Sequence, residues 1–158
     1  MQMLLTLSFD GTAYHGFQVQ KNALSVCEVL QNGMQRLYGV RPPVKGCSRT
    51  DAGVHALGYC VSYAPPKAIP PGKLPLSLNR FLPDDIRVLA AVPVADDFHA
   101  RYSAVSKEYV YKIWNSPVDD PFCAKYHWRI SQPLNEAAMA QAAAFAVGTH
   151  DFCAFMST

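Results

Sequence analysis

Between residues 3 and 94 the sequence alternates between strand-like and helix-like segments in one fixed order. Apolar residues at every second position, or in short continuous runs, mark the strands, whereas spacings of three and four mark helices. In chain order we expect a strand at 3–9, a helix between Ser25 and Gly39, a short strand within 41–50, a strand at 56–64, a short helix at 76–81 and a strand at 86–94. This mixture predicts an α+β protein.

The first helix has the clearest signal. Ser25 and Glu28 form the S-x-x-E pattern of a capping box, in which each side chain serves a backbone amide that the first helical turn leaves unpaired. Gly39 offers a C-terminal stop, because glycine readily adopts the left-handed conformation that ends helices. Between these two signals the apolar residues recur at helical spacing: Val26, Val29, Leu30, Met34 and Leu37.

The order β-α-β-β-α-β predicts a ferredoxin-like (RRM-like) domain over residues 1–104, with one sheet that carries two helices on one face. Residues 105–158 follow a different pattern, with one strand in "KEYVYKIWN" (107–115) and one Ala-rich helix at 136–147 that Asn135 caps. One strand and one helix cannot bury both their apolar faces. Either the chain is therefore a fragment, or residues 105–158 dock on a partner.

Composition excludes several classes of protein. Half of the residues are hydrophobic and 16% are charged, which predicts a packed core rather than disorder. No apolar run is long enough to span a bilayer, and the N-terminus lacks the pattern of a signal peptide. Five scattered cysteines without C-x-x-C spacing favour free thiols in a reducing compartment. His55 and His99 match no zinc spacing, so no metal site is expected.

The segment "CSRTDAGVHALG" (47–58) is the strongest candidate for chemistry. Asp-x-Gly between two strands is explained by an Asx turn alone. Arg49 precedes Asp51 by two residues and favours a charged carboxylate, while Gly53 permits close approach of a ligand. A carboxylate held ionised in a cleft is a candidate nucleophile or general base. Both interpretations fit this segment by itself.

The longer context resembles one family. "RTDAGVHA" resembles the signature loop of the TruA-type tRNA pseudouridine synthases, and "FDGTAYHGFQVQ" resembles the strand and loop at their N-terminus. Later segments of the family are matched in order by "LNRFLPDDIRV", "DDFHARYSAVSKEYVYKIWN" and "GTHDFCAF". The resemblance covers essentially the whole chain. It implies that the chain is the N-terminal portion of such an enzyme, with the C-terminal part of the catalytic fold absent, and that residues 105–158 are the truncated beginning of a second, similar domain.

The resemblance implies roles for particular residues. Asp51 corresponds to the catalytic aspartate, Arg49 to the arginine that admits the flipped nucleotide, and Tyr109 to the tyrosine that stacks on the target base. Arg101, within the matched "FHAR" segment, is the best candidate for a contact with RNA. Ser48 departs from the family pattern, since many members carry glycine there, and we expect a slightly different local turn.

The implied reaction is the isomerisation of uridine to pseudouridine in the anticodon stem-loop of tRNA, by a cytoplasmic homodimer without metal or cofactor. The sequence leaves open whether Asp51 attacks covalently or acts as a base. It also leaves open two alternatives to an active enzyme. One is a non-catalytic RNA-binding fragment that lacks the second half of the active-site cleft. The other is a second half completed by strand exchange between two copies.

Overall fold

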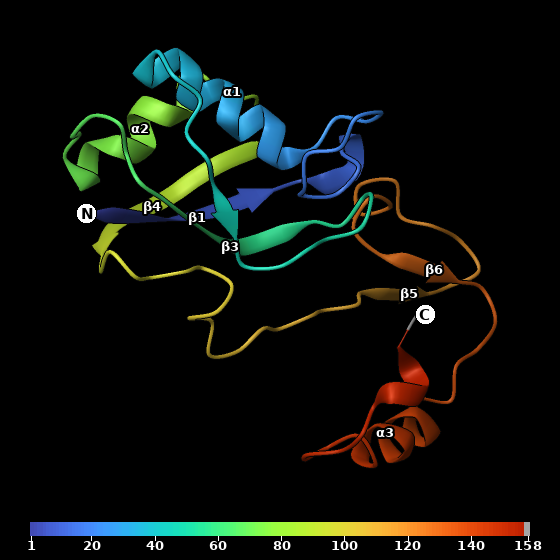
Figure 1. The fold of residues 1–158 in the computed structure, drawn as a ribbon. Coiled ribbons are helices and arrows are strands. Elements are labelled where there is room, and N and C mark those ends of the chain that lie inside the picture. The colour runs from blue at the N-terminus through green and yellow to red at the C-terminus, as the bar shows by residue number, and fades with distance from the viewer. Residues whose placement is uncertain (157–158) are drawn as a thin grey trace. The chain divides into compact units, whose positions relative to one another are not determined.

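A computed structural model describes residues 1–156 of the chain. The chain divides into two compact units, Met1–Lys107 and Glu108–Thr158. Within the first unit, strands and helices form two layers (Figure 1). The observed protein is α+β, as the sequence predicts. Among residues 1–156 no helix is both long and apolar enough to cross a membrane.

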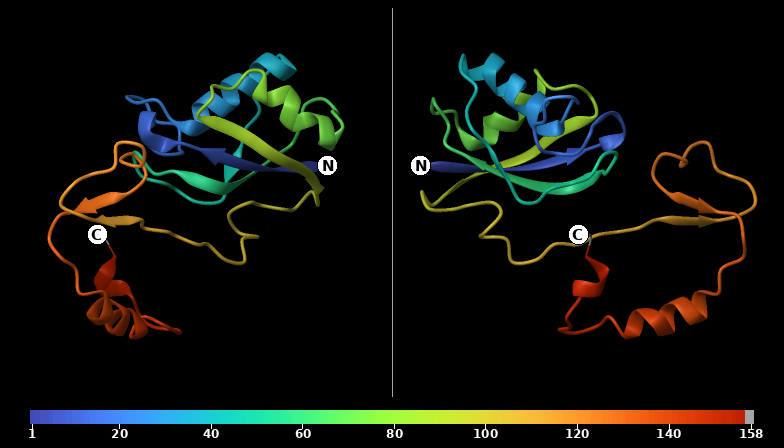
Figure 2. Two further views of the ribbon diagram at one scale, coloured as in Figure 1. Left: turned by 180° about the vertical axis from the view of Figure 1, so that it is seen from behind. Right: turned by 45° about the vertical axis from the view of Figure 1, so that its right-hand side comes forward.

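The first unit is built on a four-stranded antiparallel sheet. Its strands lie in the order β2-β3-β1-β4. Their bounds are β1 Gln2–Phe9, β2 Lys45–Gly46, β3 Ala56–Tyr63 and β4 Ile86–Val94. All four expected strands are therefore present, although β2 is only two residues long. Both helices of this unit, α1 (Val26–Tyr38) and α2 (Leu74–Asn79), cover the same face of the sheet (Figure 2).

The core lies between this sheet face and the two helices. Along β1 the side chains alternate between half-buried and buried, and the buried set is Met3, Leu5, Leu7 and Phe9. Because successive strand residues point to opposite faces, this alternation turns one side of β1 onto the helices. Leu30 and Met34 of α1 and Leu74 and Leu78 of α2 belong to the same buried cluster.

The Ser25 and Gly39 signals of the first helix are confirmed, but among residues 1–156 the Glu28 side chain does not complete the capping box. The side-chain oxygen of Ser25 accepts a hydrogen bond from the Glu28 amide at 3.2 Å and caps α1. Gly39 ends the helix with a φ of +80° and donates from its amide to the Gln35 carbonyl at 2.8 Å. The second helix begins at Leu74, two residues before the expected start. A 3-10 turn at Pro71–Lys73 leads into it, and Pro75 fits because the first helical turn leaves its amides unpaired.

The second unit differs from the sequence prediction in one respect. It contains two strands, β5 (Ile113–Asn115) and β6 (Trp128–Ile130), paired in parallel, where one longer strand at 107–115 was expected. The prediction was wrong because strand β6 was not predicted. Backbone pairing exists only where β6 lies beside the chain. The Asn115 side chain reinforces it by donating to the Ile130 and Gln132 carbonyls at 2.8 and 2.7 Å.

Helix α3 (Glu136–Ala144) follows in the second unit, and the Asn135 side chain caps it by accepting from the Ala138 amide at 3.0 Å. The helix ends three residues before the expected position, and Phe145 at its C-terminus is exposed. None of the residues of α3 is buried. A helix this apolar with no buried face has not packed its side chains within the described part of the chain.

Candidate active site

The loop that carries Asp51 runs from the end of β2 to the start of β3. Its tip is a turn in which the Val54 amide donates to the Asp51 carbonyl at 3.3 Å, and Gly53 has a φ of +78°. A positive φ at the third position is typical of a type II turn and favours glycine there. The main chain closes the turn. Among residues 1–156 the carboxylate of Asp51 takes part in no hydrogen bond, so no Asx turn forms.

A second loop, residues 10–17, packs against the Asp51 loop. A Cβ built on Gly16 would lie 2.1 Å from the Thr50 carbonyl oxygen, and one built on Gly11 would lie 2.0 Å from the Val54 carbonyl oxygen. The Gly53 amide donates to the Tyr14 carbonyl at 3.0 Å. Because glycine has no side chain, Gly11 and Gly16 allow the two backbones to come into contact. This contact fixes the position of the turn that carries Asp51.

Buried aromatic side chains anchor both loops. The Tyr59 hydroxyl donates to the Ser48 carbonyl and accepts from the Ser48 amide at 3.3 Å, and its ring stacks on Phe17 with centroids 4.3 Å apart. The Tyr14 hydroxyl donates to Asp85 at 2.7 Å. Burial raises the pKa of both hydroxyls well above the ordinary value. Both therefore stay protonated and keep these hydrogen bonds at neutral pH.

His55 closes the loop on the side of β3. Its Nδ1 lies 3.1 Å from the Gly11 amide nitrogen and 3.0 Å from an oxygen of Asp10. The same Asp10 oxygen accepts from the Thr12 amide at 2.9 Å. His55 thus ties the two loops together through contacts with a loop other than its own. Among the described residues no group of histidines, cysteines and carboxylates is arranged to hold a metal ion.

Asp51 and Arg49 line one pocket of about 370 Å³, whose other wall is formed by His15 and by residues 18–20. Both side chains belong to exposed residues. The described residues contain no ion pair between Arg49 and Asp51. The loop places a carboxylate and a guanidinium group on the same open pocket, and each is available to a ligand.

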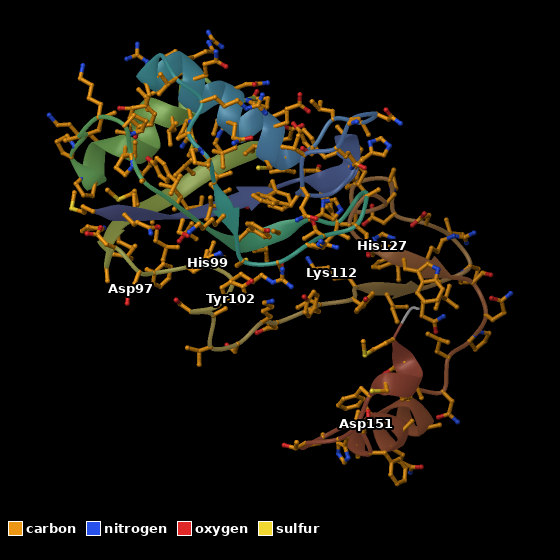
Figure 3. All side chains as sticks on the ribbon, viewed as in Figure 1. Asp97, His99, Tyr102, Lys112, His127 and Asp151 are labelled. Atoms are coloured by element: carbon orange, nitrogen blue, oxygen red, sulfur yellow. The ribbon has the colours of Figure 1, made fainter. Side chains whose placement is uncertain are left out.

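Arg101 lines a neighbouring pocket of about 320 Å³ together with Arg49. It follows β4 in a turn closed by the Ser103 amide, which donates to the His99 carbonyl at 2.8 Å. His99 and Tyr102 lie against each other on this loop, with ring centroids 4.4 Å apart (Figure 3). The structure thus brings Arg101 and Arg49, from segments far apart in the sequence, to one pocket of the first unit.

Tyr109 belongs to the second unit. It lies in the segment 107–112 that precedes β5, outside any strand, and its side chain is 67% exposed. Ser48, the position that departs from the family pattern, does not adopt a positive φ, since among residues 1–156 only glycines do. Serine therefore fits the loop without strain.

The sequence identified the residues on the pocket but not the residues that hold them in place. Tyr14, Phe17, Tyr59 and Tyr63 are all buried. That the Tyr59 hydroxyl pins the Ser48 backbone had no signal in the sequence, because the two residues meet only through the pairing of β2 with β3. The glycines of "FDGTAYHG" were the one available hint of a close backbone contact.

This antiparallel α+β scaffold carries the groups that a protein needs to bind a polar, anionic ligand and to present an acid–base or nucleophilic group to it, a carboxylate and arginines on adjacent open pockets. A family model described as tRNA pseudouridine synthase matches residues 6–103, more than half of the chain. The chain belongs to this family.

Curated relatives agree over nearly the full length of the chain. It is 47% identical over 156 residues to the tRNA pseudouridine synthase A of Thermoanaerobacter sp. (strain X514), an alignment that covers 99% of this chain and 64% of the relative. It is 44% identical to the protein of the same name from Ruminiclostridium cellulolyticum, over 98% of this chain and 63% of the relative. The protein from Moorella thermoacetica is 46% identical, with 96% and 62% covered. The chain thus spans just under two thirds of the length of these relatives.

Proposed function

We propose that this chain carries the Asp51 half of a tRNA pseudouridine synthase site, in which Asp51 is the catalytic carboxylate. One observation supports this assignment above others. The Asp51 carboxylate lies on an open pocket beside Arg49 and has no partner among the described residues, although the loop around it is held by backbone and aromatic contacts. A catalytic carboxylate must be held in position and yet be free to contact a substrate. A firmly held loop whose carboxylate has no partner meets both requirements.

The proposed reaction is an isomerisation and needs no co-reactant. The C1′–N1 bond of a uridine breaks, the uracil rotates, a C1′–C5 bond forms, and the proton on C5 passes to N1 through a base. Every atom of the substrate is retained, so neither an oxidant nor a metal is required for balance. Asp51 serves either as nucleophile at the sugar or as the base, and both roles need an ionised carboxylate within reach of the nucleotide.

A uridine reaches such a pocket only after it leaves its stack, which costs about a few kcal/mol. We propose Tyr109 as the aromatic side chain that offsets part of this cost, since an aromatic face against a base is worth roughly 1–3 kcal/mol. Its exposed ring is available for this role. Arg49 is proposed to contact the flipped nucleotide and Arg101 to contact the RNA next to it.

Further proposals concern substrate, architecture and assembly. The resemblance supports uridines of the anticodon stem-loop as targets, a homodimer as working form and the cytoplasm as location. The antiparallel order β2-β3-β1-β4 with both helices on one face supports a ferredoxin-like first domain over 1–104. For 105–158 we propose the beginning of a second similar domain, which the unburied helix α3 supports.

Incubation of the chain with an unmodified tRNA transcript, followed by mapping of pseudouridine, tests the function. Asp51→Ala and Asp51→Asn are expected to abolish product. Asp97→Asn is the matched control, because it removes the same charge from an exposed residue of the same unit, on the loop after β4. Product that persists in Asp51→Asn would show that another group does the chemistry.

The same experiment addresses the non-catalytic alternative. A folded chain that binds tRNA but forms no pseudouridine would identify an RNA-binding module. This alternative draws support from one finding, that no cation among the described residues forms an ion pair with Asp51. Binding and turnover are therefore measured on the same preparation.

A further inference from the structure

The two arginine-lined pockets of the first unit are contiguous. Arg49, Gln18 and Val19 line both of them, whereas Asp51 lines only the first and Arg101 only the second. A ligand that occupies the Asp51 pocket therefore has a direct neighbour site. In that site a guanidinium group approaches from each of two separate segments of the chain.

The charges of the second pocket are unbalanced. Its lining includes Arg49 and Arg101 and no carboxylate. No ion pair among residues 1–156 involves either arginine, and the Arg101 guanidinium lies over the Tyr102 ring, 5.9 Å from its centroid. Two like charges on one concave site repel each other, and an anion bound between them offsets this repulsion. The pocket is thus built to gain from a bound anion.

Guanidinium groups and a single phosphate match in chemistry and geometry. A phosphodiester presents two non-bridging oxygens, and arginine donates to such oxygens in a planar fork. Gln18 and Ser48 add polar groups to the same lining, while Phe17 and Val44 supply apolar walls that limit water. Phosphate contacts of this kind set the register of a nucleic acid on a protein without reading its sequence.

We propose that Arg49 and Arg101 clamp one backbone phosphate of the RNA, the phosphate that directly adjoins the nucleotide whose base lies beside Asp51. This inference rests on the proposed function, since it takes RNA as the ligand of the first pocket. It adds a division of labour between the pockets. The first receives the base and sugar, the second holds the adjoining phosphate, and Arg49 bridges the two.

The test uses the full chain and a set of anticodon stem-loop RNAs, each with one neutral methylphosphonate in place of a backbone phosphate. The proteins are the unaltered chain, Arg101→Gln and Arg36→Gln. Arg36 is the matched control, because it loses the same charge but stacks on Phe81 at 4.9 Å, away from both pockets. Affinity is measured over a range of salt concentrations.

We expect Arg101→Gln to weaken binding about 10-fold at low salt, and the slope of log K against log[salt] to fall by about 0.7. At one position next to the target uridine, the methylphosphonate is expected to weaken the unaltered chain and Arg36→Gln about 10-fold, and to weaken Arg101→Gln by less than 2-fold. That lack of additivity identifies the clamped phosphate.

Two outcomes overturn the proposal while leaving the proposed function intact. One is an affinity of Arg101→Gln for RNA equal to that of Arg36→Gln. The other is that Arg101→Gln shows the same methylphosphonate effect as the unaltered chain at every position of the RNA. If the unaltered chain binds none of the RNAs, the clamp is overturned together with the proposed function, and that result is distinct from the first two.

Discussion

The α-carbon of Gly16 lies against the carbonyl oxygen of Thr50, so closely that a side chain at Gly16 would place its Cβ 2.1 Å from that oxygen. Thr50 is the residue before Asp51, and Gly16 belongs to the loop that follows β1. The position of the candidate catalytic carboxylate is thus set by a backbone contact from a distant segment.

Gly16→Ala is expected to cost about 2–4 kcal/mol of unfolding free energy. The new methyl group meets the Thr50 backbone, and the φ of +78° at Gly16 is unfavourable for alanine. Gly39→Ala separates the two effects, because Gly39 has a φ of +80° and open space around it. That control is expected to cost about 1–2 kcal/mol. Equal losses in the two variants would contradict the importance of the contact with Thr50.

Unfolding is followed by far-ultraviolet circular dichroism in a urea titration, to which the secondary structure of both units contributes. Both tryptophans, Trp114 and Trp128, lie in the second unit, so their fluorescence reports on that unit alone. The same measurement serves the predictions below.

Tyr59→Phe is expected to cost about 1–2 kcal/mol and to loosen the loop around Asp51, because both hydrogen bonds to the Ser48 backbone are lost while the ring keeps its place on Phe17. Hydrogen exchange at residues 47–54 is expected to accelerate. Tyr111→Phe is the control, since the Tyr111 ring is 86% exposed. Unchanged exchange in Tyr59→Phe would show that the glycine contacts hold the loop without the hydroxyl.

Stability of the first unit is expected to fall at alkaline pH. Burial raises the pKa of Cys27 to about 11 and raises the pKa values of Tyr14, Tyr59 and Tyr63 further. Their neutral forms are favoured in the folded state, so the stabilisation is complete below the unfolded pKa values and is lost as pH rises through the folded ones.

The loss is expected to begin above pH 9, the ordinary pKa of Cys27, and to steepen above pH 10, that of the tyrosines. Each group adds a slope of about 1.4 kcal/mol per pH unit within its own window. Urea titrations at a series of pH values measure this slope, and Tyr63→Phe is expected to reduce it only above pH 10. A slope unaffected by that substitution would assign the loss to other groups.

Asn79→Ala is expected to cost about 2–3 kcal/mol. The Asn79 side chain donates to the Val88 carbonyl at 2.9 Å and accepts from the Val88 amide at 2.8 Å, next to the irregularity in the pairing of β1 with β4. Removal of the amide leaves both backbone groups of Val88 without these partners. Asn22→Ala, in an exposed loop, is expected to change stability by less than about 0.5 kcal/mol. A similar loss at both positions would rule out a special role for Asn79.

Much of the first unit was predictable because its signals are local. The cap at Ser25 and the stop at Gly39 act on backbone groups within four residues of themselves, and the burial alternation of β1 follows from the period of a strand. The same holds for Asn135 at the start of α3. The candidate residues Asp51 and Arg49 also stand in one short segment, where spacing alone brings them to one loop.

Residues 107–112 mark the limit of such reasoning. They alternate like a strand but lie outside β5, because a strand needs a second backbone to pair with and β5 meets β6 only at Ile113–Asn115. The parallel partner at Trp128–Ile130 carries no local signal of that pairing. Sequence periodicity indicates which residues suit a strand. It does not indicate where the pairing with a neighbouring strand begins or ends.

Local sequence signals are enough to predict the element order of the first unit, the caps of α1 and α3, and the residues on the Asp51 loop. The tertiary structure decided that Tyr59 holds Ser48, that Gly16 supports Thr50, and that Arg101 shares a pocket with Arg49. The physical reason is the range of the interactions. Caps and strand periods act between near neighbours in the chain, whereas these contacts join residues that only the pairing and stacking of whole elements bring together.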